Sequence, residues 1–301
     1  MWASNVPSKT LCIVIDLTGT LTTFYPEPTK LEQLVQASWN IHHRGGLPVQ
    51  VGDIIRATGS WVWGMLTRRL MLSIFQATYH WADKRSMSSW ARLPRAVAYE
   101  FLLALSLAPC CYGIAAPFAE KVLAFDAADS GFGVAYRRAS VGVRNELSAR
   151  IERRGSWTAF ETGESGEVGP ARRINRLDSS LAQTTANWLL SGWGPGPRGW
   201  HIARAGAWHF PVAHINLGEI KASLIAGEHA ATRPRQCQDV RTIFLGDNQA
   251  ALGALSKGRS SNPAMNSVCR RWLGLSVVAG LYSVWVHIRS KANPSDVPSR
   301  L

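Results

Sequence analysis

The 301-residue chain has few cysteines and no long hydrophobic run. Its five cysteines, at positions 12, 110, 111, 237 and 269, are scattered and form no Cys-x-x-Cys pair. This number and spacing argue against a disulfide framework or a zinc site and favour a reducing compartment. The longest apolar stretch, Phe101 to Phe118, is interrupted by Pro109 and Pro117, whereas a transmembrane helix needs roughly 20 mostly apolar residues. The first ten residues lack a basic region followed by an apolar one, so we expect an intracellular protein that is neither secreted nor embedded in a membrane.

Acidic side chains are also scarce relative to basic ones. The chain has 20 Asp and Glu against 33 Lys and Arg, which gives a formal net charge of +13. Residues 121–301 carry 23 basic and 13 acidic side chains, whereas residues 1–120 carry 10 and 7. An excess of this size predicts a polyanionic partner, either nucleic acid or an anionic membrane surface. The apolar fraction of 46% is sufficient for a packed core and excludes wholesale disorder.

The spacing of apolar residues divides the chain near residue 118. The first part, 1–118, is expected to be mainly helical after one short strand, and the second part, 119–301, alternates strands and helices. Together they predict a protein of the α/β or α+β class. In the first part we expect a strand at 11–15, a helix around Leu31 to Val35, and helices over 51–66, 70–81 and 96–107.

The second part begins with a predicted β-hairpin over 121–138, whose first strand is continuously apolar. Residues 139–200 are predicted to be an insertion that contains a helix at 144–154 and loops at 162–169 and 191–199. Further along the chain we expect strands at 208–215, 241–245 and 281–288, and helices at 217–231, 249–255 and 263–273.

Four carboxylates stand where these predicted elements begin or end. Asp126 closes the first apolar strand, Glu219 opens a helix, Asp247 follows a strand, and Asp296 follows the last strand after a short basic linker. Such positions meet at one edge of an α/β sheet. Grouped carboxylates repel one another unless cations lie between them, and oxygen-only ligands suit Mg²⁺ or Mn²⁺. Two such ions roughly 3.5–4 Å apart hydrolyse phosphodiesters.

Each carboxylate also has a simpler interpretation. Asp126 could start a turn, and Asp247 and Asp296 could each be the N-cap of a following helical turn. Asn216 and Glu219 have the spacing of a capping box, so Glu219 could merely cap its helix. These alternatives explain the residues one at a time, but they do not explain why all four occupy element ends.

The four carboxylates lie within four short motifs. Phe125-Asp-Ala-Ala-Asp-Ser-Gly-Phe-Gly133 resembles the first hairpin of ribonuclease H domains, and His214-Ile-Asn-Leu-Gly-Glu219 resembles the strand-to-helix junction of their retroelement members. Leu245-Gly-Asp-Asn-Gln-Ala-Ala251 resembles the third acidic motif. Ser290-Lys-Ala-Asn-Pro-Ser-Asp-Val-Pro-Ser-Arg300 resembles the fourth, as found in DIRS-like and related reverse transcriptases. The resemblance implies a mixed sheet with flanking helices and an enzyme that cleaves the RNA strand of RNA–DNA hybrids.

The first part of the chain resembles the region that follows the polymerase palm. Leu11-Cys-Ile-Val-Ile-Asp16 and Ala57-Thr-Gly-Ser-Trp-Val-Trp63 are similar to segments near the thumb and connection helices of retroelement reverse transcriptases. No Asp-Asp pair of the palm occurs in the chain. The resemblance therefore implies the C-terminal part of a polyprotein, without polymerase activity, whose partners are an RNA–DNA hybrid and an upstream polymerase segment within a ribonucleoprotein.

The same resemblance implies roles for individual residues. Asp126, Glu219 and Asp247 would hold one or both Mg²⁺ or Mn²⁺ ions, and Asp296 would complete the second site. His287 lies within a predicted strand and is expected to be structural. A further set of polar residues near the acidic motifs would contact nucleic acid, the alternative being an ordinary solvated surface. These residues are Asn248, Arg289, Lys291 and Arg300.

Two other functions remain open on the sequence. Ile15-Asp-Leu-Thr-Gly-Thr-Leu21 resembles the nucleophile motif of haloacid dehalogenase-type phosphatases, with Asp16 as nucleophile, although Thr18 replaces the aspartate that serves as general acid. The chain could instead be an inactive, nucleic-acid-binding remnant of a retroelement. Loss of cleavage with retention of hybrid binding would distinguish the remnant from the nuclease.

Overall fold

The computed structural model describes residues 13–17, 23–152, 187–192, 199–209, 211–232 and 239–300. The chain divides into two compact units, and both helices and strands occur in each. The first unit comprises residues 1–116 together with 258–277, and the second comprises 117–257 together with 278–301. The sequence division near residue 118 therefore agrees with the unit boundary, except that residues 258–277 had been assigned to the second part.

Helices form most of the first unit. They are α1 (Pro28–His43), α2 (Val51–Met65), α3 (Gln76–Ala82), α4 (Arg95–Ser106) and α10 (Pro263–Val278), with 3-10 segments η2 (Leu66–Phe75) and η3 (Ala108–Cys110). The strands are short: β1 (Ile13–Asp16), β2 (Thr23–Pro26) and β5 (Gly113–Ile114) form one antiparallel sheet, and β3 (Pro48–Gln50) pairs with β4 (Trp90–Arg92). This agrees with the predicted helical character of the first part.

The helix predicted over residues 70–81 is divided into η2 and α3. The side chain of Glu100 on α4 accepts hydrogen bonds from the backbone N–H groups of Ala77 and Thr78, at 2.6 and 2.8 Å. These N–H groups lie in the first turn of α3, where they have no partner within the helix. The start of α3 is thus set by a side chain more than twenty residues away in sequence, which no local pattern reveals.

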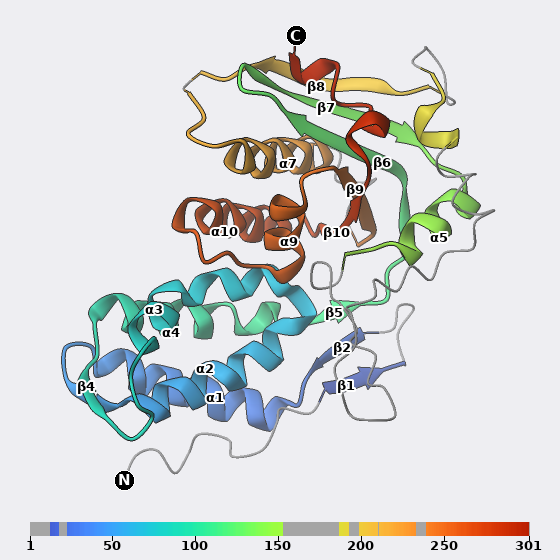
Figure 1. The fold of residues 1–301 in the computed structure, drawn as a ribbon. Helices are drawn as coiled ribbons and strands as arrows, with labels where there is room; N and C mark the ends of the chain where they lie inside the picture. The colour runs from blue at the N-terminus through green and yellow to red at the C-terminus, as the bar shows by residue number, and fades with distance from the viewer. Residues whose placement is uncertain are drawn as a thin grey trace, which may run out of the picture. The chain divides into compact units, whose positions relative to one another are not determined.

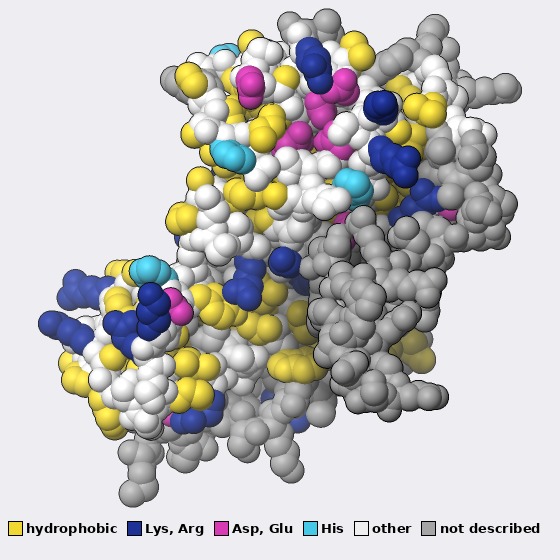
Figure 2. All heavy atoms as spheres, in the orientation of Figure 1, with side chains coloured by type: hydrophobic (Ala, Val, Ile, Leu, Met, Phe, Trp, Pro, Cys, Tyr) yellow, Lys and Arg dark blue, Asp and Glu magenta, His cyan; other side chains and the backbone are white. Residues whose placement is uncertain are grey.

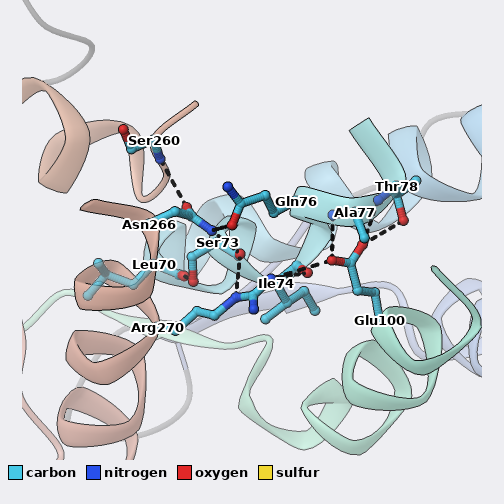
Figure 3. Close-up of polar contacts among 10 residues, drawn as sticks. All are labelled: Leu70, Ser73, Ile74, Gln76, Ala77, Thr78, Glu100, Ser260, Asn266 and Arg270. Atoms are coloured by element: carbon cyan, nitrogen blue, oxygen red, sulfur yellow. Dashed lines mark hydrogen bonds and ion pairs between the residues drawn. The ribbon is translucent and has the colours of Figure 1, made fainter. Parts of the chain in front are cut away.

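Polar side chains of α10 attach this helix to the first unit (Figure 3). Asn266 Nδ2 donates to the backbone oxygen of Ser73 at 2.8 Å, and Arg270 Nε donates to the same oxygen at 3.0 Å. Arg270 also reaches Ile74 O at 3.1 Å and the carboxylate of Glu100 at 3.4 Å. These bonds satisfy buried carbonyl groups, so α10 belongs physically with the first unit.

The second unit is built on a five-stranded mixed sheet in the order β10-β9-β6-β7-β8 (Figure 1). The strands are β6 (Phe118–Ala127), β7 (Gly131–Arg138), β8 (His201–Ala207), β9 (Arg241–Gly246) and β10 (Tyr282–His287). β9 runs parallel to both β6 and β10, whereas β6, β7 and β8 are antiparallel neighbours. The helices are α5 (Val141–Ala149), α7 (Ile215–Ala231) and α9 (Gln249–Lys257), followed by the 3-10 turns η4 (Ser290–Ala292) and η5 (Pro298–Arg300). The predicted α+β class is confirmed.

Alternate residues of the central strand β6 face the two sides of the sheet. Val122 and Ala124 belong to a buried cluster that includes Val143 and Leu147 of α5. Phe125 points to the other side, where its ring centroid lies 6.4 Å from that of Trp285. In Figure 1, α5 and α7 lie on opposite sides of the sheet. Burial on both faces accounts for the unbroken apolar sequence of β6.

The strand predicted at 208–215 is wrong, since the strand of this region is β8, which ends at Ala207. The apolar residues that suggested it serve other contacts. Trp208 donates from its indole Nε1 to Ala128 O at 2.9 Å, and its ring lies 5.1 Å from that of Phe132. It therefore packs against the β6–β7 turn and does not extend the sheet.

The predicted insertion 139–200 is described only in part. Its helix is α5, which begins after Ser140, whose Oγ accepts from Val143 N–H, and ends at Ala149, before the predicted end at 154. Residues 153–186 and 193–198, which include the predicted loop at 162–169, lie outside the described residues. Among the helices that are described, none has the length and apolar character needed to cross a membrane.

Candidate metal centre

The register of two parallel strands brings Asp126 and Asp247 together. Ala124 of β6 lies opposite Leu245 of β9. Asp126 and Asp247 each stand two residues further along, at the carboxyl ends of their strands, so both leave the sheet at the same edge. This is the edge at which open α/β sheets bind ligands.

Glu219 comes from α7, which packs against the end of β6. A Cβ added to Gly218 would lie 3.2 Å from Cβ of Ala127, so a glycine allows the helix to approach the strand closely. Glu219 accepts a hydrogen bond from the backbone N–H of Ala127. The capping-box alternative is wrong, because the N-cap of α7 is His214, whose ring nitrogen accepts from Asn216 N–H at 3.1 Å.

The three carboxylates form a compact group. Oxygen atoms of Asp126, Glu219 and Asp247 all lie within 4.8 Å of one another. Asp126 and Glu219 are each 4% exposed, and Oε2 of Glu219 has no hydrogen-bond partner among the described residues. Figure 2 shows acidic side chains gathered in one place on this face of the second unit, with lysine and arginine side chains beside them.

Burial and mutual repulsion perturb both buried carboxyl groups. Burial, followed by the charges of Asp126 and Asp247, raises the pKa of Glu219 to about 9. Burial also raises the pKa of Asp126 to about 6, with smaller contributions from Asp247 and Asp296 and an opposing contribution from the bond to Ser299. Partly buried carboxylates that are costly to ionise together are typical of sites that hold a cation. An unpartnered buried oxygen within an all-oxygen donor set fits Mg²⁺ or Mn²⁺.

The alternative interpretation of Asp247 as the N-cap of α9 is wrong. Asn248 has this role, because its Oδ1 accepts from Ala251 N–H at 3.0 Å. Asn248 Nδ2 donates to Oδ1 of Asn216 at 2.9 Å and so links the starts of α9 and α7. His287 Nε2 lies 3.1 Å from the backbone oxygen of Asp247, which fixes the loop after β9. The structural role predicted for His287 thus corresponds to a specific contact.

Asp126 is not a turn residue, since it pairs with Gly133 within the β6–β7 ladder. Its carboxylate is held by the C-terminal segment. Asn293 Nδ2 donates to Oδ1 at 3.1 Å, and Ser299 Oγ donates to Oδ2 at 2.6 Å. Neither residue was singled out from the sequence as part of the site. The only available signal was their position on either side of Asp296 in the motif that ends at Arg300.

Asp296 lies near this group but does not belong to it. The three-carboxylate group does not include it, although its charge contributes to the raised pKa of Asp126. Its Oδ1 accepts from Arg300 Nη2 at 2.8 Å. The fourth predicted ligand is thus engaged in an ion pair at the border of the site.

The other residues predicted to contact nucleic acid follow β10 in the chain. Arg289 and Lys291 are exposed and follow the end of β10. Arg300 is exposed as well, but it pairs with Asp296. These cationic side chains place positive charge on the segment whose Asn293 and Ser299 donate hydrogen bonds to Asp126.

No protein-family model matches the chain, and a search of curated proteins finds no match for it. The geometry of the site therefore carries the functional argument.

Proposed function

We propose that the second unit is a ribonuclease H-type endonuclease that cleaves the RNA strand of RNA–DNA hybrids. The observation that carries the proposal is the meeting of Asp126, Glu219 and Asp247, from three separate parts of the fold, around a buried oxygen that has no partner within the described part of the chain. The mixed sheet with flanking helices is the architecture that the four-motif resemblance implies. The net charge of +13 suits a polyanionic substrate.

Mg²⁺ or Mn²⁺ would be held by Asp126, Glu219 and Asp247, with Asp296 bordering a second position. When bound, two such ions supply activation of the attacking water and neutralisation of charge on the leaving oxygen. The protein orients these ligands, because Asn293 and Ser299 hold Asp126 and His287 holds the loop of Asp247.

The remaining residues bind and orient the substrate. Arg289, Lys291 and Arg300 would contact phosphates and contribute affinity without reading sequence. Selection of the RNA strand would depend on its 2′-hydroxyl groups and on groove shape. Asn248, next to Asp247, would contact the substrate through the second N–H of its Nδ2, since the first donates to Asn216 and its Oδ1 caps α9.

As the C-terminal part of a retroelement reverse transcriptase, the chain would act beside an upstream polymerase segment within an intracellular ribonucleoprotein. The first unit would then correspond to thumb- and connection-like helices. The phosphatase alternative loses support, because Asp16 ends a strand of an antiparallel sheet and, among the described residues, belongs to no carboxylate group that could hold a metal.

The decisive experiment incubates the chain with a labelled RNA–DNA hybrid and Mg²⁺. Asp126→Asn, Glu219→Gln and Asp247→Asn should each reduce cleavage by at least about 100-fold, since each removes a charged ligand of the ions. Asp129→Asn is the matched control, because Asp129 is an exposed carboxylate three residues from Asp126 in the hairpin turn, and it should cleave normally.

Full activity of the Asp126 variant would exclude the assignment of the metal site. Hybrid binding without cleavage at any Mg²⁺ or Mn²⁺ concentration would favour the inactive remnant. Hydrolysis of a small phosphomonoester that disappears in Asp16→Asn would revive the phosphatase.

A further inference from the structure

The last residues of the chain pack directly onto the hairpin that carries Asp126. Gly133 lies opposite Asp126 in the ladder. A Cβ at Gly133 would come within 2.6 Å of both Ser295 O and Ser299 N. The backbone of the C-terminal segment, residues 293–299, therefore occupies the space that any other side chain would fill.

Two side chains of this segment engage both oxygens of one carboxylate. Asn293 donates to Oδ1 of Asp126 at 3.1 Å and also to the backbone oxygen of Phe125 at 3.1 Å. Ser299 Oγ lies 2.6 Å from Oδ2 of Asp126 and 2.9 Å from the backbone oxygen of Asp296. The carboxylate is the nearer acceptor and the more strongly accepting one, since hydrogen bonds to ionised groups are short and strong.

We propose that Asn293 and Ser299 are positioning residues that fix the Asp126 carboxylate for divalent-cation binding, so that the C-terminal segment completes the site. The inference rests on the proposed function, and it adds a positioning role for two residues outside the acidic group. A carboxylate oxygen has two acceptor directions. A donor on each oxygen occupies one direction and leaves the other for an ion, in a fixed orientation.

Both residues are buried, with Asn293 at 6% and Ser299 at 1% exposure. Their donors are thus shielded from competing water, and the carboxylate cannot rotate without breaking one of the two bonds. Hydrogen bonds to the ligands of a metal ion typically change its affinity or the activity by about 10–100-fold.

The test measures Mn²⁺ binding to the full chain by calorimetry, with Ser299→Ala as the variant. Mn²⁺ affinity should fall by about 10–100-fold. Ser295→Ala is a matched control, because Ser295 is a fully buried serine of the same segment whose hydroxyl has no hydrogen-bond partner in the ranges that the structure describes. It should bind Mn²⁺ as the unchanged chain does. Ser299→Thr retains the hydroxyl and should restore most of the affinity.

Cleavage of a labelled hybrid supplies the second readout. Ser299→Ala should lower kcat at a fixed Mn²⁺ concentration and leave KM for the hybrid unchanged, and additional Mn²⁺ should recover the rate. Thermal unfolding of each variant identifies a general loss of structure. If Ser299→Ala is unfolded, Asn293→Ala takes its place, since it removes the donor to Oδ1 of Asp126, and unchanged Mn²⁺ affinity of this folded variant would overturn the positioning role.

The outcomes separate the two proposals. Equal Mn²⁺ affinity for Ser299→Ala and the unchanged chain would overturn the positioning role, even if the hybrid is cleaved in an Asp126-dependent way. A selective loss of Mn²⁺ affinity in Ser299→Ala would sustain the positioning role even if no hybrid is cleaved, in which case the ribonuclease proposal fails alone. Absence of Mn²⁺ binding to the unchanged chain would overturn both.

Discussion

At the scale of single residues, the side chain of Glu219 is costly to ionise in the folded protein, because burial raises its pKa to about 9. It is buried, one of its oxygens lacks a partner among the residues with described positions, and oxygens of two other carboxylates lie within 4.8 Å. The N-cap of α7 does not require a charge there, because His214 caps this helix. Residues that lower stability at a ligand site are retained for what they bind.

Glu219→Gln should therefore stabilise the protein in the absence of divalent cations at pH 8. The substitution keeps the shape of the side chain and removes a carboxyl group that is ionised in the unfolded chain at pH 8 but must take up a proton when it is buried, because its pKa in the folded state is about 9. Since a buried polar group that loses its interactions with water costs about 1–3 kcal/mol, the free energy of unfolding should rise by at least about 1 kcal/mol. Urea unfolding in EDTA measures the change, with Asp129→Asn as the neutral comparison. A destabilised Glu219 variant would contradict this interpretation.

The raised pKa values also give the pH dependence a definite sign. The pKa of Asp126 rises from 3.8 to about 6, and the pKa of Glu219 rises from 4.5 to about 9. Between the unfolded and the folded pKa of each group, the folded state binds more protons than the unfolded state. The stability that these groups contribute is therefore greatest at low pH and is lost as the pH rises through their folded-state pKa values. In EDTA, the contribution of these two groups should lower Tm between pH 5 and pH 9. The double variant Asp126→Asn, Glu219→Gln should flatten that part of the profile.

Mg²⁺ should oppose this loss, because it binds the ionised carboxylates and so stabilises the folded state by mass action. The increase in Tm on adding Mg²⁺ should be larger at pH 8 than at pH 5. An equal increase at both pH values, or one that persists in the double variant, would show that the ion acts elsewhere.

At the scale of secondary-structure elements, close backbone approach decides the geometry of the site. Gly218 brings α7 to β6, and Gly133 admits the C-terminal segment against β7. In both cases the neighbour of the glycine is backbone or a small fixed side chain, which cannot move aside cheaply.

Gly133→Ala should displace the C-terminal segment, since the added Cβ would meet two backbone atoms at 2.6 Å. Hybrid cleavage should drop by at least about 10-fold, because the donors to Asp126 move with the segment. Gly253→Ala is the matched control: no atom of the other described residues outside its own helix lies within 4 Å of its Cβ position in α9, and alanine in a helix should add about 0.5–1 kcal/mol of stability. Normal cleavage by Gly133→Ala would argue against the role of the segment.

The elements around the site could be predicted from the sequence. The continuous apolar run of β6 identified the strand of Asp126, and the strand and helices expected at 241–245, 217–231 and 249–255 lie close to β9, α7 and α9. Trp208 misled the prediction, because an apolar residue that closes a turn looks the same as one that extends a strand. The start of α3 and the attachment of α10 depend on Glu100, Asn266 and Arg270, whose partners are distant in sequence.

The candidate site could likewise be predicted from the sequence only in part. The positions of Asp126, Glu219 and Asp247 at the ends or starts of predicted elements indicated that they would meet, since the carboxyl ends of parallel strands lie at one edge of a sheet. The donors to Asp126 could not be predicted, because a serine and an asparagine in a short polar segment have no local signature of a distant partner.

At the scale of the whole molecule, the excess of positive charge should govern substrate affinity. Binding to nucleic acid releases counterions, and log K falls with log salt concentration by about 0.9 for each phosphate neutralised in a duplex. The dissociation constant of a hybrid should therefore rise steeply between 50 and 200 mM salt, in titrations followed by fluorescence anisotropy.

Lys291→Ala should weaken hybrid binding and reduce the salt slope by about 1, because it removes one phosphate contact. Lys84→Ala offers a comparison, as Lys84 is an exposed lysine of the first unit, in the turn after α3. An unchanged slope for the Lys291 variant would leave this segment outside the substrate path.

The path of the chain through α10 has a practical consequence. The polypeptide leaves the second unit after residue 257, contributes a helix to the first, and returns at residue 278. The two units are consequently joined three times by peptide bonds, and a single proteolytic nick near residue 116 would not release either of them. A truncated protein that begins at residue 117 would keep helix α10 but would lack Ser73 and Glu100, to which side chains of this helix bind.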